Sequence, residues 1–370
     1  MENSYITKRQ YGLIIFFIPF VFKFSVLPSI LSEKAARDIW LVMLLIMLTE
    51  LAQLIFIVKV DKMGGLDAIK ERYGKITYYL LSAPVLAVMI LKASVYTSET
   101  TSYANSYLFY NITTQGVGII VILASSYIAV KGAKGLGRIV ELALWLVPIA
   151  IIIGALFGKL KLTPDYALPI GANGLGPIAI SFDSALFWVL DFSPLLFLKI
   201  REDVTLSPRK RTRFPWVPVA AISSAILMVG LYLAYVMNYG GAGHLVDTAF
   251  SSLGAFNVVN TEIGSIDWPA ITLWLSIAIV SLSLKLFASS KVISSNNVPF
   301  PVAVLLTALV IIVISQLAFY NLEKAFDFAT SFVRYVVLGI ELLVPMTAYV
   351  LLDIKERKHQ KEHHPLEATI

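Results

Sequence analysis

Ionisable side chains occur at the centre of otherwise apolar stretches, and the first is Lys23, which lies between Pro19 and Pro28. A charge at that depth in a membrane costs ~3 kcal/mol or more, so it usually faces a protein interior or a wet cavity. Proline removes a backbone donor and clashes with the preceding turn, which predicts a broken helix near Lys23. Transporter-type folds place ligands at such breaks, so Lys23 and its neighbours Phe22 and Ser25 are candidate ligand contacts.

A second group, Lys92, Tyr96 and Glu99, lies in one apolar stretch. Lys92 and Glu99 are seven residues apart, which is two helical turns, so they share one face at ~10 Å along the axis. The alternative is the end of a helix that becomes polar as it leaves the membrane. That alternative explains residues 102–107 well but Lys92 poorly, so all three are candidate pocket residues.

Asp191 is the natural counter-ion for Lys23 or for a ligand ammonium, and Phe187 lies one helical turn before it, so both are candidate ligand contacts. Buried opposite charges are tolerated when they are paired and hydrogen-bonded. A purely architectural Lys23 pair is the alternative. For Glu50 and Glu341, which are also deep, we expect pairing between helices rather than ligand contact.

The residue inventory argues against an enzyme. The chain has no cysteine and four histidines, three of which lie in the tail from His359 onward. We find no nucleophile–base arrangement, phosphate-binding loop or metal-ligand spacing. We therefore expect no catalytic residues, no metal site and no cofactor.

The composition is that of an integral membrane protein, because 58% of the 370 residues are apolar, 15% are charged and the mean hydropathy is +0.78. Soluble domains carry about 25% charged residues. A membrane helix needs ~20 apolar residues. Ten such stretches are present, at about 10–31, 38–58, 77–104, 114–131, 138–158, 178–199, 215–238, 268–288, 299–320 and 327–352. The predicted fold class is all-α, with ten transmembrane helices.

The ten stretches divide into five plus five within a single transmembrane domain covering 1–370: a first half at 1–158, a second half at 178–352 and a tail at 353–370. An odd number of spans per half gives the halves opposite orientations. The first span of each half carries proline and charge inside it. Such paired interruptions point to an inverted-repeat, transporter-type fold with spans 1 and 6 broken.

The distribution of positive charge predicts that both termini are cytoplasmic. With that orientation, 22 of the 30 lysines and arginines lie on the inner side, including both at 285–291. Inner loops of membrane proteins carry such an excess. The basic run 209–213 is therefore interpreted as a loop facing membrane lipid, and we expect no nucleic-acid partner.

Three signatures carry a family resemblance: Pro28-Ser-Ile with Ala35-x-x-Asp38-x-Trp40; Tyr127-x-Ala129-x-Lys131-Gly132 followed by Arg138; and Leu168-Pro169 with Gly174. With these signatures in this order, the chain resembles the B-subunit permeases of bacterial spore-germination receptors. That family lies within the amino acid–polyamine–organocation transporter superfamily. The chain departs from it at the break in span 1, where Val21, Phe22 and Lys23 stand in place of small residues.

The resemblance implies a nutrient sensor rather than an enzyme, located in the inner membrane of a bacterial spore. Such a subunit binds a small, amino-acid-like nutrient between spans 1, 3, 6 and 8 and triggers germination together with A and C subunits. Two alternatives remain open: a proton-coupled amino-acid transporter, and a scaffold subunit whose pocket Lys23 has filled.

Overall fold

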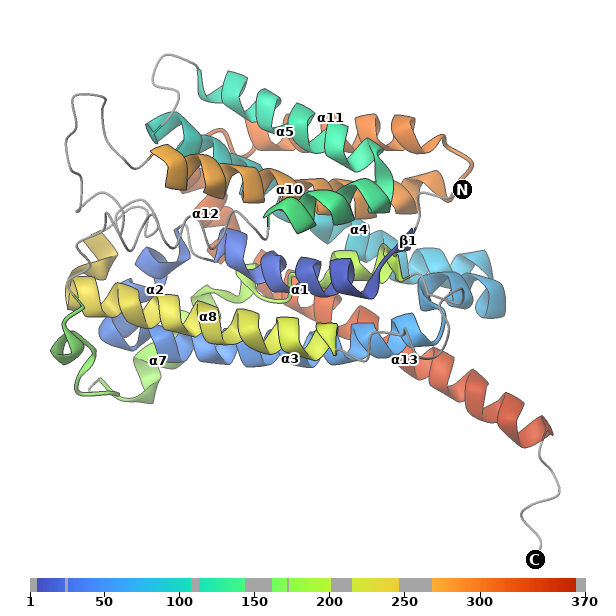
Figure 1. Cartoon of the computed structure of the whole chain (residues 1–370), viewed down its shortest axis with the longest axis horizontal. Helices are drawn as coiled ribbons and strands as arrows, with labels where there is room; N and C mark the ends of the chain where they lie inside the picture. The colour runs from blue at the N-terminus through green and yellow to red at the C-terminus, as the bar shows by residue number, and fades with distance from the viewer. Residues whose placement is uncertain are drawn as a thin grey trace, which may run out of the picture.

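The computed structural model describes residues 5–23, 26–107, 113–143, 162–171, 173–200, 215–245 and 268–363. Within these ranges the side chains of residues 21, 22, 106, 107, 268–273 and 358–363 are not described. The described chain is almost entirely helical, so the predicted all-α class is confirmed (Figure 1).

The first half of the chain is built from long helices with short connections. Its described helices are α1 (Lys8–Phe22), α2 (Leu27–Ala35), α3 (Ile39–Lys62), α4 (Gly65–Tyr107), α5 (Thr114–Val130) and the helix Gly132–Ala143. A capping box begins α1, in which the Thr7 side chain accepts from the Gln10 amide and the Gln10 side chain accepts from the Thr7 amide. Reciprocal capping of this kind satisfies donors that a helix start leaves free.

The second half is more irregular at its start. Its main elements are α7 (Leu175–Ser184), the short 3-10 helices η4 (Leu186–Trp188) and η5 (Ser193–Phe197), α8 (Trp216–Tyr239), η7 (Gly240–Leu245), α10 (Trp268–Ser294), α11 (Phe300–Leu317), α12 (Leu322–Thr330) and α13 (Val333–His363). Two further 3-10 helices lie elsewhere: η2 (Ala36–Asp38) follows α2 in the first half, and η3 (Pro164–Ala167) precedes α7.

Among the described residues, six helices are long and apolar enough to cross a membrane, or up to eight if each of two bent pairs forms one span. Part of the fifth predicted span, residues 144–158, lies outside the described residues. The count of ten and the inverted repeat therefore stay predictions, whereas the multi-pass membrane class is established.

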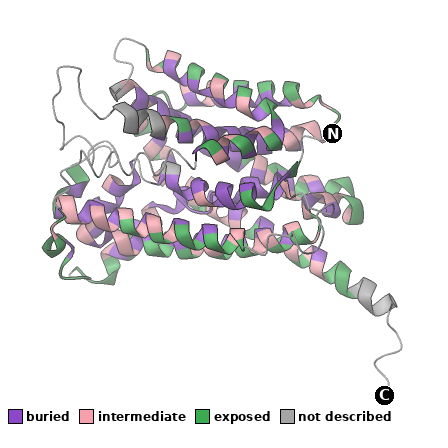
Figure 2. Cartoon of the chain, in the orientation of Figure 1, coloured by how far each residue is buried: buried purple, intermediate pink, exposed green. Residues whose placement is uncertain are grey.

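Burial follows the pattern of a helical bundle inside lipid. Buried residues gather between the helices, and exposed residues mark their outward faces (Figure 2). Many of the outward residues are large and apolar, for example Ile120 on α5, Leu305 on α11 and Leu343 on α13. Apolar side chains on that surface suit contact with acyl chains.

A short parallel pairing joins residues near the beginning of the chain to the end of the predicted sixth span. Strand β1 (Tyr5–Ile6) pairs with β2 (Lys199–Ile200). Next to it, Lys199 forms an ion pair with Asp67 at the beginning of α4. The beginning of α1 and the protruding end of α13 lie toward the same end of the bundle (Figure 1).

Candidate functional site

The first span is interrupted where the sequence predicts. Helix α1 ends at Phe22, α2 begins at Leu27, and the Lys23 side chain is fully buried. The Tyr232 hydroxyl on α8 donates to the Lys23 carbonyl oxygen, so a backbone acceptor freed by the end of the helix finds a partner. Of the predicted neighbours, Ser25 and the Phe22 side chain lie outside the described part of the chain.

The predicted sixth span is interrupted as well, with a bend of 59° between α7 and the segment Leu186–Phe197 that follows. Val189 is extended, and Leu190 has a positive φ of 65°. The Gln53 side-chain amide on α3 satisfies this opened backbone: Nε2 donates to the Leu190 carbonyl at 3.1 Å, and Oε1 accepts from the Phe192 amide at 3.2 Å. Non-helical backbone inside a membrane needs such internal partners.

The two breaks face one group of six charged side chains, which we call the lysine–carboxylate cluster. They come from the end of α1, from α3, α4, α10 and α13, and from the segment between η4 and η5. With three ammonium groups and three carboxylates, the cluster is neutral when every member is ionised. Its members, each at most 2% exposed, are Lys23, Glu50, Lys92, Asp191, Lys285 and Glu341.

Lys23 links the two breaks directly. Its Nζ lies 2.8 Å from Asp191 Oδ2 and 2.6 Å from Glu50 Oε1. The predicted pairing of Lys23 with Asp191 is therefore present, and Glu50 on α3 pairs with another segment of the bundle as expected.

Lys92 forms the second half of the cluster. Its Nζ donates to the Val189 carbonyl at 2.8 Å, to Asp191 Oδ1 at 3.3 Å and to Glu341 Oε2 at 2.5 Å. The other oxygen of Glu341 accepts from the Ser193 hydroxyl at 3.2 Å. Lys92 thus ties α4 to the break in the sixth span and to α13.

Tyr96 stands one helical turn after Lys92 and also contacts Asp191. Its hydroxyl oxygen lies 3.0 Å and 3.1 Å from the two carboxylate oxygens. Its ring faces the Lys285 ammonium, which lies 4.8 Å from the ring centroid and 3.7 Å from Asp191 Oδ1. The structure therefore brings Tyr96 together with Lys23, Lys92 and Asp191, all four of which are candidates from the sequence.

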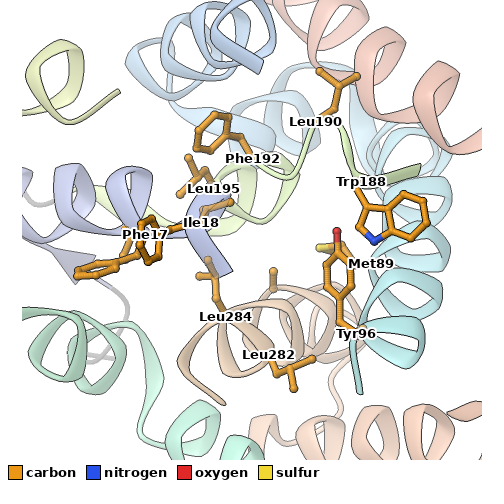
Figure 3. Packing of buried hydrophobic residues seen from close by; sticks show 14 of the residues in the cluster. Phe17, Ile18, Met89, Tyr96, Trp188, Leu190, Phe192, Leu195, Leu282 and Leu284 are labelled. Carbon is orange, nitrogen blue, oxygen red and sulfur yellow. The ribbon is translucent and has the colours of Figure 1, made fainter. Parts of the chain in front are cut away.

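Glu99 and Phe187 lie beside the cluster rather than in it. Glu99 Oε1 accepts from the Trp188 indole at 2.9 Å, and its other oxygen has no hydrogen-bond partner among the described residues. Phe187 packs edge-on against Trp188 and Phe328. Figure 3 shows Trp188 and Tyr96 in the same part of the buried core. A ligand contact for Glu99 or Phe187 stays a prediction.

Sequence reasoning missed two members of the site, Lys285 and Gln53. It assigned Lys285 to the cytoplasmic side, and that assignment is wrong, because α10 continues to Ser294 and holds Lys285 inside the buried cluster. A signal was present, since Lys285 falls inside the predicted span 268–288. For Gln53 the signal was its spacing of three residues from Glu50, which puts both on one face of a helix.

Two small cavities lie away from the cluster. One of about 20 Å³ lies between α1, the helix Gly132–Ala143 and α10, and its lining is apolar apart from Ser281. The other, of about 30 Å³, lies near β2 and the beginning of α4. Neither of the two is lined by a member of the lysine–carboxylate cluster. At the breaks themselves, the charged side chains bind one another.

A model of a family described as spore germination protein, of the spore permease type, matches residues 5–321. The chain belongs to the spore germination permease family. This finding confirms the resemblance drawn from the three signatures. The match covers both broken spans and every member of the cluster except Glu341. No curated protein matches this permease.

Proposed function

We propose that this spore germination permease is the nutrient-sensing subunit of a germinant receptor. It binds a small, polar, amino-acid-like nutrient at the lysine–carboxylate cluster and triggers germination together with A and C subunits in the spore inner membrane. The observation that carries the proposal is the convergence of two broken spans on one buried group of charges. Family membership supports the link to germination.

The arrangement in the membrane is part of the proposal. We infer ten spans in one domain, organised as two inverted halves of five, with both termini cytoplasmic. The two interrupted spans support the repeat, because an inverted repeat places an interruption at the same position in each half. The beginning of α1 and the end of α13 lie toward the same end of the bundle (Figure 1). This supports the placement of both termini on one side of the membrane.

Sensing follows from the mutual pairing of the charges in the site. A nutrient that pairs with cluster residues must replace ion pairs that now hold α1, α3, α4, α13 and the sixth span together. The bound state therefore has a different set of contacts between these elements. Differential affinity for two such states is enough to shift their populations, and no transport step is required.

Spores carrying Lys23→Ala or Asp191→Ala test the proposed site. We expect either variant to lose most of the nutrient response, because each removes a charge that links the two breaks. Germination is measured as a function of nutrient concentration, with protein abundance determined in parallel. The matched control is Asp183→Ala, which removes a partly exposed acid of the same span that pairs with Arg334.

A change of abundance is separated from a change of response by the double variant Lys23→Met/Glu50→Gln. This variant removes an opposite-charge pair instead of leaving one buried charge unpaired. We expect it to reach normal abundance and still to lose the response. An unchanged nutrient response of both single variants at normal abundance would sink the proposed site.

A second candidate is a proton-coupled amino-acid transporter, and Glu99 favours it. A deeply buried carboxylate that accepts a single described hydrogen bond is the kind of group found in proton relays. Uptake of labelled amino acids by proteoliposomes under a pH gradient discriminates the two functions. Flux supports transport, whereas ligand binding without flux supports sensing.

The third candidate is a scaffold subunit without a ligand, which the internally paired, neutral cluster favours. A scaffold would bind no nutrient, and its deletion would reduce the abundance of the A subunit. Nutrient binding to the purified chain contradicts this candidate.

A further inference from the structure

The side chain of Asp191 has the surroundings expected for a bound carboxylate ligand, because cationic and neutral donors enclose both of its oxygens. Three ammonium groups, those of Lys23, Lys92 and Lys285, approach its two oxygens at 2.8, 3.3 and 3.7 Å. The Tyr96 hydroxyl adds a neutral donor within 3.1 Å of either oxygen. All five residues are at most 2% exposed. Charge-assisted donors of this kind form the strong hydrogen bonds of carboxylates.

The distribution of charge makes Asp191 the shared anion of the cluster. Glu50 forms an ion pair with Lys23, and Glu341 forms one with Lys92. Asp191 contacts all three lysines. Removal of Asp191 leaves three ammonium groups and two carboxylates around one small volume. That excess positive charge is costly in a low-dielectric interior unless another anion replaces it.

The backbone that carries Asp191 is held by its contacts. Leu190, immediately before it, has a φ of 65°, a conformation that residues other than glycine rarely adopt. The segment between η4 and η5 also lacks the hydrogen-bond ladder of a helix, and Gln53 and Lys92 hold its carbonyls. Once Asp191 loses its lysine partners, only the hydrogen bonds of Gln53 and Lys92 to the backbone still restrain this segment.

We propose that the three lysines form a carboxylate-binding site, and that Asp191 occupies it as a tethered substitute for an external carboxylate. This proposal rests on the function proposed above. The nutrient brings a carboxylate that displaces Asp191 from the three lysines, and the segment between η4 and η5 then moves. The chemical class of the ligand is therefore a small carboxylate.

Competition with a tether decides which carboxylates displace Asp191. Asp191 is already held in position by the chain, whereas a free carboxylate loses translational and rotational freedom on binding, so a plain carboxylate competes poorly with it. The displaced Asp191 also needs a new cation. A ligand that carries an ammonium group beside its carboxylate supplies that cation, and total charge is conserved.

Acetate binding to the full-length Asp191→Gly variant in lipid nanodiscs tests the site, because acetate resembles the side chain that this substitution removes. Thermal unfolding is followed as acetate replaces chloride at constant ionic strength. We expect a saturable rise in Tm, about 2–4 °C at ten times the dissociation constant, for the variant and none for the wild type. Ethylammonium chloride, which offers a cation alone, is expected to have no effect.

Two controls isolate the lysines. Asp183→Gly removes an acid from the same broken span, outside the cluster, and is expected to show no response to acetate. The double variant Asp191→Gly/Lys285→Met is expected to lose at least part of the response of the single variant. A folded Asp191→Gly protein with no saturable response to acetate overturns the proposal.

Poor folding of the variant does not prevent the test. The Asp191→Ala variant then replaces it, with formate in place of acetate, because formate resembles the carboxylate group that this substitution removes. If that variant also fails to fold, the yield of folded protein becomes the readout: recovery by formate during purification supports the site, and no recovery overturns it.

The wild-type protein separates this inference from the proposed function. Glycine, which carries both charges, is expected to compete with Asp191 where acetate does not. Acetate binding to Asp191→Gly together with normal germination of the cluster variants would preserve the carboxylate site and contradict the nutrient function. Loss of germination in the cluster variants, with no acetate binding to Asp191→Gly, would support the nutrient function and contradict the carboxylate site.

Discussion

At the scale of single residues, the partners of a buried acid decide what it contributes. Glu341 and Glu99 are both glutamates and both fully buried, and they differ in what they contact. Glu341 forms an ion pair with Lys92, whereas Glu99 accepts from the neutral Trp188 indole. The loss of the charge therefore has different consequences at the two positions.

Glu99→Gln is expected to change the free energy of unfolding by less than about 1 kcal/mol, because a glutamine oxygen still accepts from Trp188. Glu341→Gln, the matched substitution, is expected to cost about 3 kcal/mol, because Lys92 loses a buried counter-ion. The melting temperatures of the two purified variants are compared with that of the wild type. Equal losses for both variants would contradict this account of Glu99.

At the scale of the elements, the packing of α1 on α8 depends on a glycine. A Cβ atom added to Gly12 would lie 2.9 Å from the Trp216 carbonyl oxygen and 3.0 Å from Trp216 Cβ. Small residues allow the backbones of membrane helices to approach closely. The position of α1 matters for the site because Lys23 follows its last turn.

Gly12→Ala is expected to destabilise the protein by about 1–3 kcal/mol, because backbone atoms must move to admit the new methyl group. Gly230→Ala on α8 is the control, since a Cβ there meets nothing within 4 Å. Alanine favours a helix over glycine by about 1 kcal/mol, so the control is expected to be neutral or stabilising. The melting temperatures of both variants are compared with that of the wild type. An unchanged melting temperature for Gly12→Ala would contradict the close contact between Gly12 and Trp216.

The breaks of both spans could be predicted from the sequence, because proline and charge inside an apolar run have few structural explanations. The pairing of Lys23 with Asp191 could be predicted as well, since buried charges need opposite charges. The spacing of Gln53 from Glu50 indicates only a shared helix face, whereas the hydrogen bonds of Gln53 and Ser193 could not be predicted, because they depend on the course of the opened backbone. Lys285 was misassigned, because a charge near the end of an apolar run fits a loop as well as a core.

At the scale of the whole molecule, the orientation of the bundle in the membrane determines which helix ends face the cytoplasm. The exposed end of α13 and the beginning of α4 lie toward the end of the bundle that carries β1 (Figure 1). There, Lys355 donates to the Arg72 carbonyl at 3.1 Å. Helix α12 belongs to the opposite end in the proposed topology. The orientation is open to a direct test, because the chain has no native cysteine.

Single cysteines at Glu71, Glu323 and Glu356, all exposed positions, are expected to respond differently to a membrane-impermeant maleimide. In intact cells, Glu323→Cys on α12 is expected to react, and the other two only after permeabilisation. Labelling is measured by gel shift at matched abundance. Reaction of Glu356→Cys in intact cells would contradict the proposed cytoplasmic terminus.

The ion pair between Lys23 and Glu50 has a consequence for how the chain enters the membrane during synthesis. Glu50 follows Lys23 by only 27 positions, so the carboxylate leaves the ribosome soon after the ammonium group. We therefore expect the first two spans to enter the membrane as a hairpin whose two buried charges cancel, which offsets the insertion cost of about 3 kcal/mol that each would carry alone. Asp191 is synthesised much later, and we expect it to join a pair that is already embedded in the membrane.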